Sequence, residues 1–300
     1  PNCWGYDFNH SKAPTKEYID QVNRYWVETY NIDGFRFDFT KGFANTTASF
    51  SVERINNIKR MADSIWAIDP NQYIILEHWC DNNEEEQLAD YGCMLWGNVT
   101  YGYHNSGKGF PANSSSTNGI YTNRTWTLPH LVTYMESHDE QRLMYEAITF
   151  GNASNPSHNA KDPYTALGRM QGLAVTFLSQ PGPRMIWQFG EYGYDINIDY
   201  PCRVCNKPIL WNYLQQGRRQ QLLDVYTAML TLRNNYETFR SLDFQASLGA
   251  GIKRMIMNHP TMNGVSLVNI DVNAASAIPA FQHTGWWYEY FTGDSLNVTN

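Results

Sequence analysis

Residues 33–39 read DGFRFDF, and this stretch indicates how the chain folds. Its Asp-Gly pair is a turn signal, and the five residues after the turn alternate apolar and charged side chains in the manner of a strand. Apolar side chains at spacings of three and four predict an amphipathic helix before it, at residues 15–30 with Thr15 as cap, and another after it, at residues 52–68. A strand at residues 73–76 follows, so the order is β-α-β, which implies parallel pairing and a right-handed crossover.

This alternation continues to about residue 236. We expect three further strands, at residues 93–96, 131–135 and 185–189, and three further helices, at residues 140–149, 164–178 and 218–236. Residues 97–127 are rich in Gly, Asn and Ser and are expected to form a long surface loop. Such alternation fits two α/β folds, a (β/α)8 TIM barrel or a doubly wound sheet. The first strand is not followed by a GxGxxG motif, which weakens the second, dinucleotide-binding alternative.

The pattern changes after about residue 245. Strands are expected at residues 252–257, 265–270 and 286–291, with no helix between them. This arrangement is typical of a small antiparallel β domain. We therefore divide the chain into residues 1–245, a barrel segment, and residues 246–300, the start of a β-sandwich domain.

The composition narrows the classes of partner. The chain has 300 residues, a formal net charge of −7 and 15% aromatic residues. Nucleic acids are bound by basic patches that neutralise phosphates, so the acidic balance argues against them. No apolar run in the sequence approaches the roughly 20 residues of a membrane span. The aromatic share fits a carbohydrate ligand and a large aromatic core equally well.

Five cysteines leave at least one free thiol if the others pair within the chain: Cys3, Cys80, Cys93, Cys202 and Cys205. The last two form a lone CxxC pair. A zinc site would need a second pair of ligands at suitable spacing, and the sequence has none nearby. We therefore expect either a local disulfide or two unlinked thiols there, ahead of metal or redox chemistry.

Three expected strands end in an acid: Asp38, Glu77 and Asp139. In a barrel the carboxyl ends of all strands face one side, so these acids would converge on one pocket, and glycoside hydrolysis needs such a set. Any single acid at a strand end is more often a cap or a surface charge. However, Arg36 shares a strand face with Asp38 and can hold it ionised and oriented. His138 adjoins Asp139 and can donate a hydrogen bond to a sugar hydroxyl.

Three blocks of the sequence resemble blocks of the α-amylase family, glycoside hydrolase family 13. They are DGFRFD at residues 33–38, LEHW at 76–79 and SHD at 137–139, and they occur in the family's order. Residues 41–43 and 4–6 also resemble bacterial α-amylase-like members. The resemblance spans nearly the whole chain and implies a (β/α)8 barrel followed by a β-sandwich domain.

The resemblance implies a role for each matched position. Asp38 would be the nucleophile that forms a β-glycosyl-enzyme, and Glu77 would be the general acid and then the base. Asp139 would bind sugar hydroxyls and stabilise the oxocarbenium-like state. Arg36 would orient Asp38, and His138 would assist Asp139.

Lys41, His78 and Trp79 would lie on the leaving-group side. Retaining chemistry further predicts that the carboxyl groups of Asp38 and Glu77 lie about 5–5.5 Å apart. It also predicts a raised pKa for Glu77, because an acid catalyst must hold its proton.

One family block, with an Asp and a His on the third barrel strand, has no counterpart here. The pair at residues 9–10 is Asn-His in loop-like sequence, so we do not transfer that role. We therefore expect barrel strands four to eight in this chain, with earlier strands before Pro1 and a β domain that continues past Asn300. The resemblance also implies a structural calcium with ligands mostly outside the chain. The three glutamates at residues 84–86 are interpreted as a solvated face.

The leading hypothesis is a retaining enzyme that cleaves α-1,4-glucosidic bonds of starch-like α-glucans. A debranching, cyclodextrin-cleaving or transglycosylating member of the family would have similar donor-site residues, with specificity in loops such as 97–127. A non-catalytic carbohydrate-binding homologue is a third hypothesis. A fourth is an unrelated barrel with metal chemistry, in which His78 and His138 would be ligands.

Overall fold

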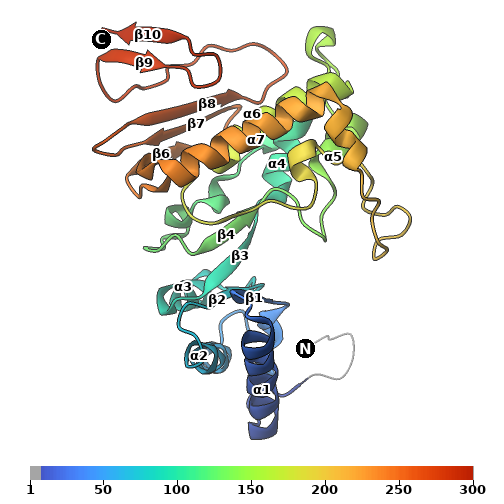
Figure 1. The fold of residues 1–300 in the computed structure, drawn as a ribbon, viewed down its shortest axis with the longest axis vertical. Helices are drawn as coiled ribbons and strands as arrows, with labels where there is room; N and C mark the ends of the chain where they lie inside the picture. Colours follow the sequence, from blue (N-terminus) through green and yellow to red (C-terminus); the bar gives the residue numbers. More distant parts are fainter. Residues whose placement is uncertain (1–7, 300) are drawn as a thin grey trace. The chain divides into compact units, whose positions relative to one another are not determined.

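The computed structural model describes residues 8–299 (Figure 1). Cys3 and the run at residues 4–6 lie outside this range. The chain divides into two compact units, one made of residues 1–98 and 121–133 and the other of residues 99–120 and 134–300. Within residues 8–299, no helix has the length and apolar composition to cross a membrane.

The first unit is a β-sheet with the helices that connect its strands. The strands β1 (Gly34–Phe37), β2 (Tyr73–Leu76), β3 (Met94–Asn98) and β4 (Leu131–Tyr134) follow one another in the order of the sheet. The pairings of β1 with β2 and of β2 with β3 are parallel, which confirms the β-α-β prediction. Three helices precede β1, β2 and β3 in turn, α1 (Ala13–Tyr30), α2 (Val52–Trp66) and α3 (Asn82–Tyr91).

Helix α2 shows how short sequence signals build this unit. Its apolar side chains recur at spacings of three and four, and Ile55, Ile58 and Ile65 are buried. The Ser51 hydroxyl accepts a hydrogen bond from the Arg54 backbone N–H and so caps the helix. Both its amphipathic face and its start therefore follow from the sequence.

Two features of the other helices differ from the predictions. The cap of α1 is Lys12, which makes no side-chain capping bond, rather than Thr15, because a proline in the first turn already supplies a helical φ. Helix α3 contains Glu84 and Glu85, which were expected on a solvated face. Both are buried, because arginines from other segments pair with them.

The second unit contains α4 (Thr100–Lys108), α5 (Leu143–Phe150), α6 (Pro163–Leu178) and α7 (Gly217–Asn235), and the short strand β5 (Arg184–Met185). Helices α5 to α7 confirm the periodicity predictions, whereas β5 is shorter than the strand expected at residues 185–189. The helices share one apolar core, to which Met144, Met170, Phe177, Leu222 and Met229 belong.

Helix α4 lies where the composition predicts a loop. Tyr103 is buried in it and meets Phe177 edge-on, with 5.7 Å between the ring centroids. A side chain at Gly102 would bring its Cβ within 2.1 Å of the Ser115 carbonyl oxygen, so this helix needs glycine there. Tertiary packing therefore produces a helix that a Gly-, Asn- and Ser-rich segment disfavours by itself.

The second unit ends in antiparallel β structure. One sheet has the order β6 (Phe244–Ser247), β7 (Ile252–Met257) and β8 (Gly264–Asn269), and a second pairs β9 (Gly285–Tyr288) with β10 (Ser295–Val298). The strand at residues 252–257 has the predicted bounds, and β6 and β10 were not predicted. The change of pattern near residue 245 is therefore present, but β6 to β10 and helices α4 to α7 belong to one compact unit. The domain boundary at residue 245 stays a prediction.

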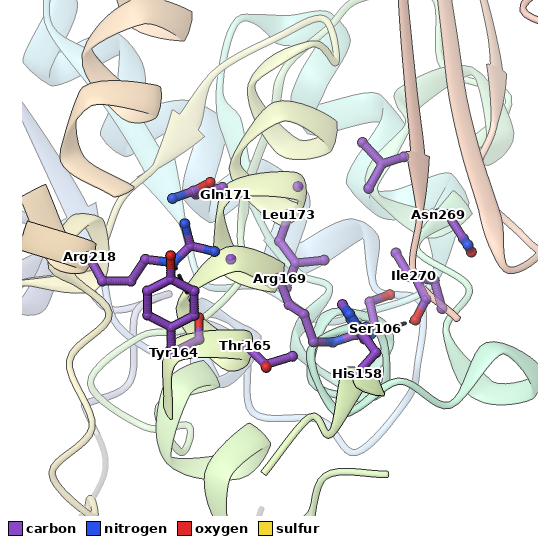
Figure 2. Close-up of a pocket in the computed structure, with 13 residues that line it drawn as sticks. Ser106, His158, Tyr164, Thr165, Arg169, Gln171, Leu173, Arg218, Asn269 and Ile270 are labelled. Atoms are coloured by element: carbon purple, nitrogen blue, oxygen red, sulfur yellow. Dashed lines mark hydrogen bonds between the residues drawn. The ribbon is translucent and has the colours of Figure 1, made fainter. Parts of the chain in front are cut away.

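A cavity of about 350 Å³ opens beside α6 and β8 in the second unit (Figure 2). Arg169 lies in its wall and donates to the carbonyl of Ser106 at 2.7 Å and to that of Gly107 at 2.8 Å. It also donates to Nε2 of His158 at 3.0 Å. Because the guanidinium of Arg169 donates to carbonyls of α4, it joins α4 to α6 in this unit.

Candidate active site

Two acids meet at the carboxyl ends of β1 and β2. The register places Phe37 opposite Leu76, so the next residues, Asp38 and Glu77, leave neighbouring strands at the same edge. Arg36 joins them, because Nη1 donates to Asp38 Oδ1 at 2.5 Å and Nη2 donates to Glu77 Oε1 at 2.7 Å. The contact between Arg36 and Asp38 was predicted from the sequence, whereas the contact between Arg36 and Glu77 depends on the register of β1 against β2.

The environments of these two acids differ. The Glu77 side chain is 5% exposed and that of Asp38 is 76% exposed. Burial is the main cause that raises the pKa of Glu77, and a hydrogen bond with Asp38 adds to the rise, whereas the Phe39 N–H and Arg36 oppose it. The direction agrees with the expectation for an acid catalyst. Asp38, by contrast, is open to solvent beside a cation.

Arg36 binds both carboxyl groups, because its guanidinium donates to one oxygen of each. The separation of about 5–5.5 Å expected of a retaining pair stays a prediction.

The backbone after each acid is strained. Phe39 and Trp79 have φ values of 43° and 49°, in the left-handed region that residues other than glycine seldom adopt. The turn at Phe39 places its N–H 2.9 Å from Glu77 Oε2, and the next N–H, of Thr40, donates to the Glu77 carbonyl at 2.8 Å. Strain of this kind concentrates at functional sites, where the surroundings hold it in place.

The residues predicted on the leaving-group side have different surroundings. Trp79 is 42% exposed, so its ring is available to stack on a sugar. Lys41 is half-buried in the short helix η1 (Thr40–Gly42). His78 is 1% exposed, with its ring nitrogens 2.9 Å from Thr40 Oγ1 and 2.9 Å from Glu84 Oε1. This buried position differs from the predicted one, because the His78 ring contacts Thr40 and Glu84 beyond the end of β2.

Asp139 and His138 lie in the second unit, in the segment that follows β4. His138 Nε2 is 3.2 Å from Asp139 Oδ2, and both side chains are about half exposed. The Trp187 ring lies beside His138, with 5.8 Å between centroids. The pair thus offers two hydrogen-bonding groups and a ring to a ligand. Asp38 and Glu77 belong to the first unit, so the convergence of all three acids on one pocket stays a prediction.

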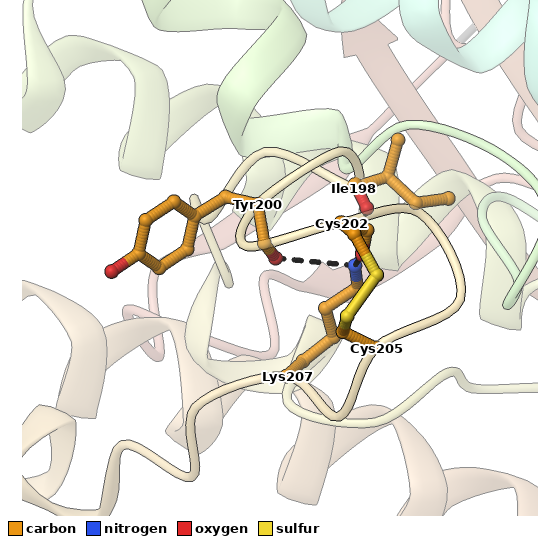
Figure 3. Close-up of a disulfide and its surroundings, with 5 residues drawn as sticks. All are labelled: Ile198, Tyr200, Cys202, Cys205 and Lys207. Carbon is orange, nitrogen blue, oxygen red and sulfur yellow. Dashed lines mark hydrogen bonds between the residues drawn. A yellow bond between two sulfur atoms is a disulfide. The ribbon is translucent and has the colours of Figure 1, made fainter.

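A short disulfide loop adjoins Asp139. Cys202 and Cys205 form a disulfide, which is one of the two states expected from the sequence (Figure 3). Arg203, between them, donates from Nη2 to the Asp139 carbonyl at 2.5 Å. Lys207 Nζ donates to the Tyr200 carbonyl at 3.1 Å, as Figure 3 shows, and to the Cys202 carbonyl at 2.6 Å. These contacts hold the disulfide loop beside Asp139.

Glu136 is a buried acid to which the sequence interpretation gave no role. Burial raises its pKa to about 7. Its Oε2 accepts a hydrogen bond from the Leu143 N–H at 2.7 Å, which caps α5, because Arg142 at the cap position supplies no side-chain acceptor. The available signal was its position at the end of a fully buried strand, only three residues before Asp139.

Replacing Glu136 by Gln is expected to remove a pH-dependent loss of stability. The folded carboxyl group keeps its proton to about pH 7 while the unfolded one loses it near 4.5, so the free energy of unfolding of the parent falls as the pH rises through this window. Gln stays neutral and still offers an acceptor to Leu143. Urea unfolding between about pH 5 and about pH 8 should show a fall smaller by roughly 2–3 kcal/mol in the variant. Parallel pH profiles for the two proteins would contradict this assignment.

His78, Cys80 and Glu84 form a group, within residues 8–299, whose ligand atoms are close enough to share a metal ion. They do not suit a cation, because Arg54 already pairs with both Glu84 oxygens, at 2.6 and 2.8 Å. Burial also raises the pKa of the Cys80 thiol to about 12. Calcium prefers six to eight oxygen ligands, and this group offers only those of one carboxylate. The group therefore supports neither the metal-chemistry hypothesis nor a calcium site.

Comparisons with known proteins relate this chain to enzymes that act on α-glucans. No family model matches the chain. It is 26% identical over 233 residues to the maltogenic α-amylase of Bacillus acidopullulyticus, covering 76% of this chain and 34% of that protein. It is 22% identical over 217 residues to the 1,4-α-glucan branching enzyme GlgB of Geobacillus stearothermophilus, covering 63% and 30% respectively. The chain thus spans about a third of the length of these curated relatives.

Solved structures share the fold. The type III pullulan hydrolase from Thermococcus kodakarensis matches with a TM-score of 0.68 and 16% identity, over 96% of this chain and 47% of that one. An α-amylase from Anoxybacillus matches with a TM-score of 0.67 and 16% identity, over 97% and 60%. At this identity the likeness concerns the fold alone, and it supports a partial α/β barrel followed by antiparallel sheets.

Proposed function

We propose that this chain, a relative of the α-amylase family, carries the catalytic carboxylates of a retaining glycoside hydrolase that cleaves α-1,4-glucosidic bonds of starch-like α-glucans. One observation carries the proposal. Arg36 holds an exposed carboxylate, Asp38, beside a buried acid of raised pKa, Glu77, at the carboxyl ends of adjacent parallel strands. A nucleophile and a proton donor need these two environments.

The reaction then proceeds in two displacements. Asp38 attacks the anomeric carbon while Glu77 gives its proton to the departing glycosidic oxygen, which leaves a β-glycosyl ester on Asp38. Glu77, now a carboxylate, removes a proton from water, and the water oxygen displaces Asp38 from the opposite face. Two inversions restore the α configuration. Arg36 keeps Asp38 anionic before the attack and compensates the charge of Glu77 once its proton has gone.

The remaining predicted residues would bind the sugar chain. Asp139 and His138 would hold hydroxyls of the sugar that reacts, and Trp79 would stack on the sugar that leaves, with Lys41 near it. A structural calcium remains part of the proposal only through the family resemblance. The second unit would contribute the β domain that follows a (β/α)8 barrel in this family.

A related activity has a specific observation in its favour. One curated relative is named as a branching enzyme and one structural neighbour as a pullulan hydrolase. Transfer to a sugar hydroxyl uses the same first displacement, with the acceptor in place of water. Product analysis on amylose, pullulan and cyclodextrins would separate hydrolysis of α-1,4 bonds from debranching, ring opening and transfer.

Retention of the anomeric configuration is the expected outcome when the protein acts on maltooligosaccharides. Proton NMR of the first products should show the α-anomer, with the β-anomer appearing later by mutarotation. Double displacement through Asp38 releases the α-anomer first, because two inversions restore the configuration of the substrate. A β-anomer formed first would contradict the mechanism, and the absence of any cleavage would favour the non-catalytic, carbohydrate-binding hypothesis.

A further inference from the structure

A buried ion pair lies behind the two acids of the first unit. Arg54 of α2 and Glu84 of α3 are both fully buried, and they pair through two bonds, Nε to Oε1 at 2.6 Å and Nη2 to Oε2 at 2.8 Å. Burying two charges costs several kcal/mol per ion unless the geometry and further hydrogen bonds compensate. Such a pair is a poor source of stability, so its geometry suggests another use.

The guanidinium of Arg54 also holds the segment that follows the nucleophile. It donates to the carbonyls of Lys41 and Ala48 at 3.3 Å each, and to that of Ser49 at 3.1 Å. Arg54 therefore fixes both ends of the loop that begins immediately after Asp38 and Phe39.

Glu84 extends the contacts in the other direction. Burial by itself would raise the pKa of Glu84, but hydrogen bonds from His78, Arg54 and Ser51 together lower it. Glu84 is thus a carboxylate, which only accepts, so His78 Nε2 must donate to it across 2.9 Å. The other ring nitrogen, Nδ1, lies 2.9 Å from the Thr40 hydroxyl, and this hydroxyl donates to the Glu77 carbonyl at 3.1 Å.

Thr40 completes the connection to the acid catalyst. Its N–H donates to the Glu77 carbonyl at 2.8 Å, and the preceding N–H, of Phe39, donates to Glu77 Oε2 at 2.9 Å. A shift of Thr40 would therefore move both the backbone of Glu77 and the donor that faces its carboxyl group.

We propose that Arg54, Glu84, His78 and Thr40 form a positioning relay that holds Glu77 in its catalytic orientation. The inference rests on the proposed function of Glu77 and extends it to residues that touch no substrate. It also gives buried His78 a role in place of contact with the leaving group.

Two substitutions test the relay at its two ends. Glu84→Gln keeps the side-chain shape but removes the charge that orients His78. Thr40→Val removes one hydroxyl and leaves the ion pair intact, so it covers the case in which Glu84→Gln does not fold. We expect kcat to fall by about 10- to 100-fold in each, as for other residues that orient a reactive group, with KM close to that of the parent. Thr40→Ser should restore most of the loss.

Glu85→Gln is the matched control. Glu85 is the next residue on α3 and is also buried, but it accepts from Arg124 and from the Cys80 N–H instead of from the relay. It should change kcat far less than Glu84→Gln does. Equal losses in the two variants would mean that any buried charge on α3 has the same effect, and this would overturn the relay.

A readout that needs no turnover separates this inference from the proposed function. Carbon-13 NMR of the Glu77 carboxyl group follows its titration directly, and Arg36 and Asp38, its charged neighbours, are unchanged in every variant. Loosening Thr40 should move the Phe39 N–H away from the Glu77 carboxyl group. Because that donor lowers the pKa of Glu77, the titration should move to higher pH in Glu84→Gln and Thr40→Val. An unchanged titration in both would overturn the relay whether or not the protein is active. If the Glu77 titration moves in the variants but the parent protein has no glycosidase activity, the relay is supported and the result counts against the proposed function.

Discussion

Asp38→Asn is expected to abolish glycosidase activity, with kcat/KM reduced on the order of 10⁴-fold or more, as for the loss of other enzymatic nucleophiles. The amide can neither attack the anomeric carbon nor leave it as a carboxylate. The fold should tolerate the change, because the Asp38 side chain is 76% exposed and Arg36 keeps its bond to Glu77 at 2.7 Å. Activity on maltooligosaccharides and circular dichroism of the same preparations check the two halves of this expectation.

Asp33→Asn is the control for this variant. Asp33 is exposed, as Asp38 is, and lies at the opposite end of β1, where its backbone carbonyl accepts from the Tyr73 N–H. Asp33→Asn removes one negative charge, as Asp38→Asn does, but far from the carboxyl end of β1. Activity should therefore stay near the parental value. If Asp38→Asn and Asp33→Asn were equally active, Asp38 would not be the nucleophile.

Chemical rescue makes the role of Asp38 specific. In Asp38→Gly, azide can enter the space of the missing carboxylate and attack an activated α-glucosyl substrate from the same face. The product should be a β-glucosyl azide, because only one inversion takes place. An α-glucosyl azide, or rescue of Asp33→Gly by the same anion, would contradict the assignment.

Local patterns were sufficient to predict part of this site. Arg36 and Asp38 are two residues apart on one strand, so their contact follows from the alternation of side chains alone. The contact from Arg36 to Glu77 spans 41 residues and requires the register of β1 against β2, which a pattern of apolar residues does not contain. The raised pKa of Glu77 was predicted from its role, and its physical cause is burial.

The errors have physical causes of the same kind. Residues 84–86 look solvated because charged residues in a row usually are, but Arg54 and Arg124 reach Glu84 and Glu85 from 30 and 39 residues away. Helix α4 depends on a close approach to Ser115 that its own sequence does not reveal. His78 is buried because its ring contacts Thr40, 38 residues away, and Glu84, and the sequence pattern shows neither contact.

Glu77→Gln should have an effect that depends on the leaving group. The amide cannot protonate a glycosidic oxygen, so cleavage of maltooligosaccharides should fall by about 10²- to 10⁴-fold. Glucosyl fluoride leaves without protonation, so the first displacement by Asp38 should proceed at close to the parental rate. The rates of the parent and the variant on the two substrates measure this difference. A burst in the first turnover would show that the first displacement still takes place. Glu86→Gln is the control. Glu86 is a half-buried residue of α3, and this substitution should lower the rate on neither of the two substrates.

The pH dependence gives the sign that identifies the acid. Glu77 must be protonated when the glycosidic bond breaks, so kcat/KM of the parent should fall as the pH rises through its pKa. Burial and the hydrogen bond with Asp38 raise that pKa, so the alkaline limb should lie above the range of an ordinary glutamic acid. The limb should be missing when Glu77→Gln acts on glucosyl fluoride, because no proton is then required. If the limb persisted unchanged in this variant, another group would be the acid, and Arg36 would be holding Glu77 for a structural reason alone.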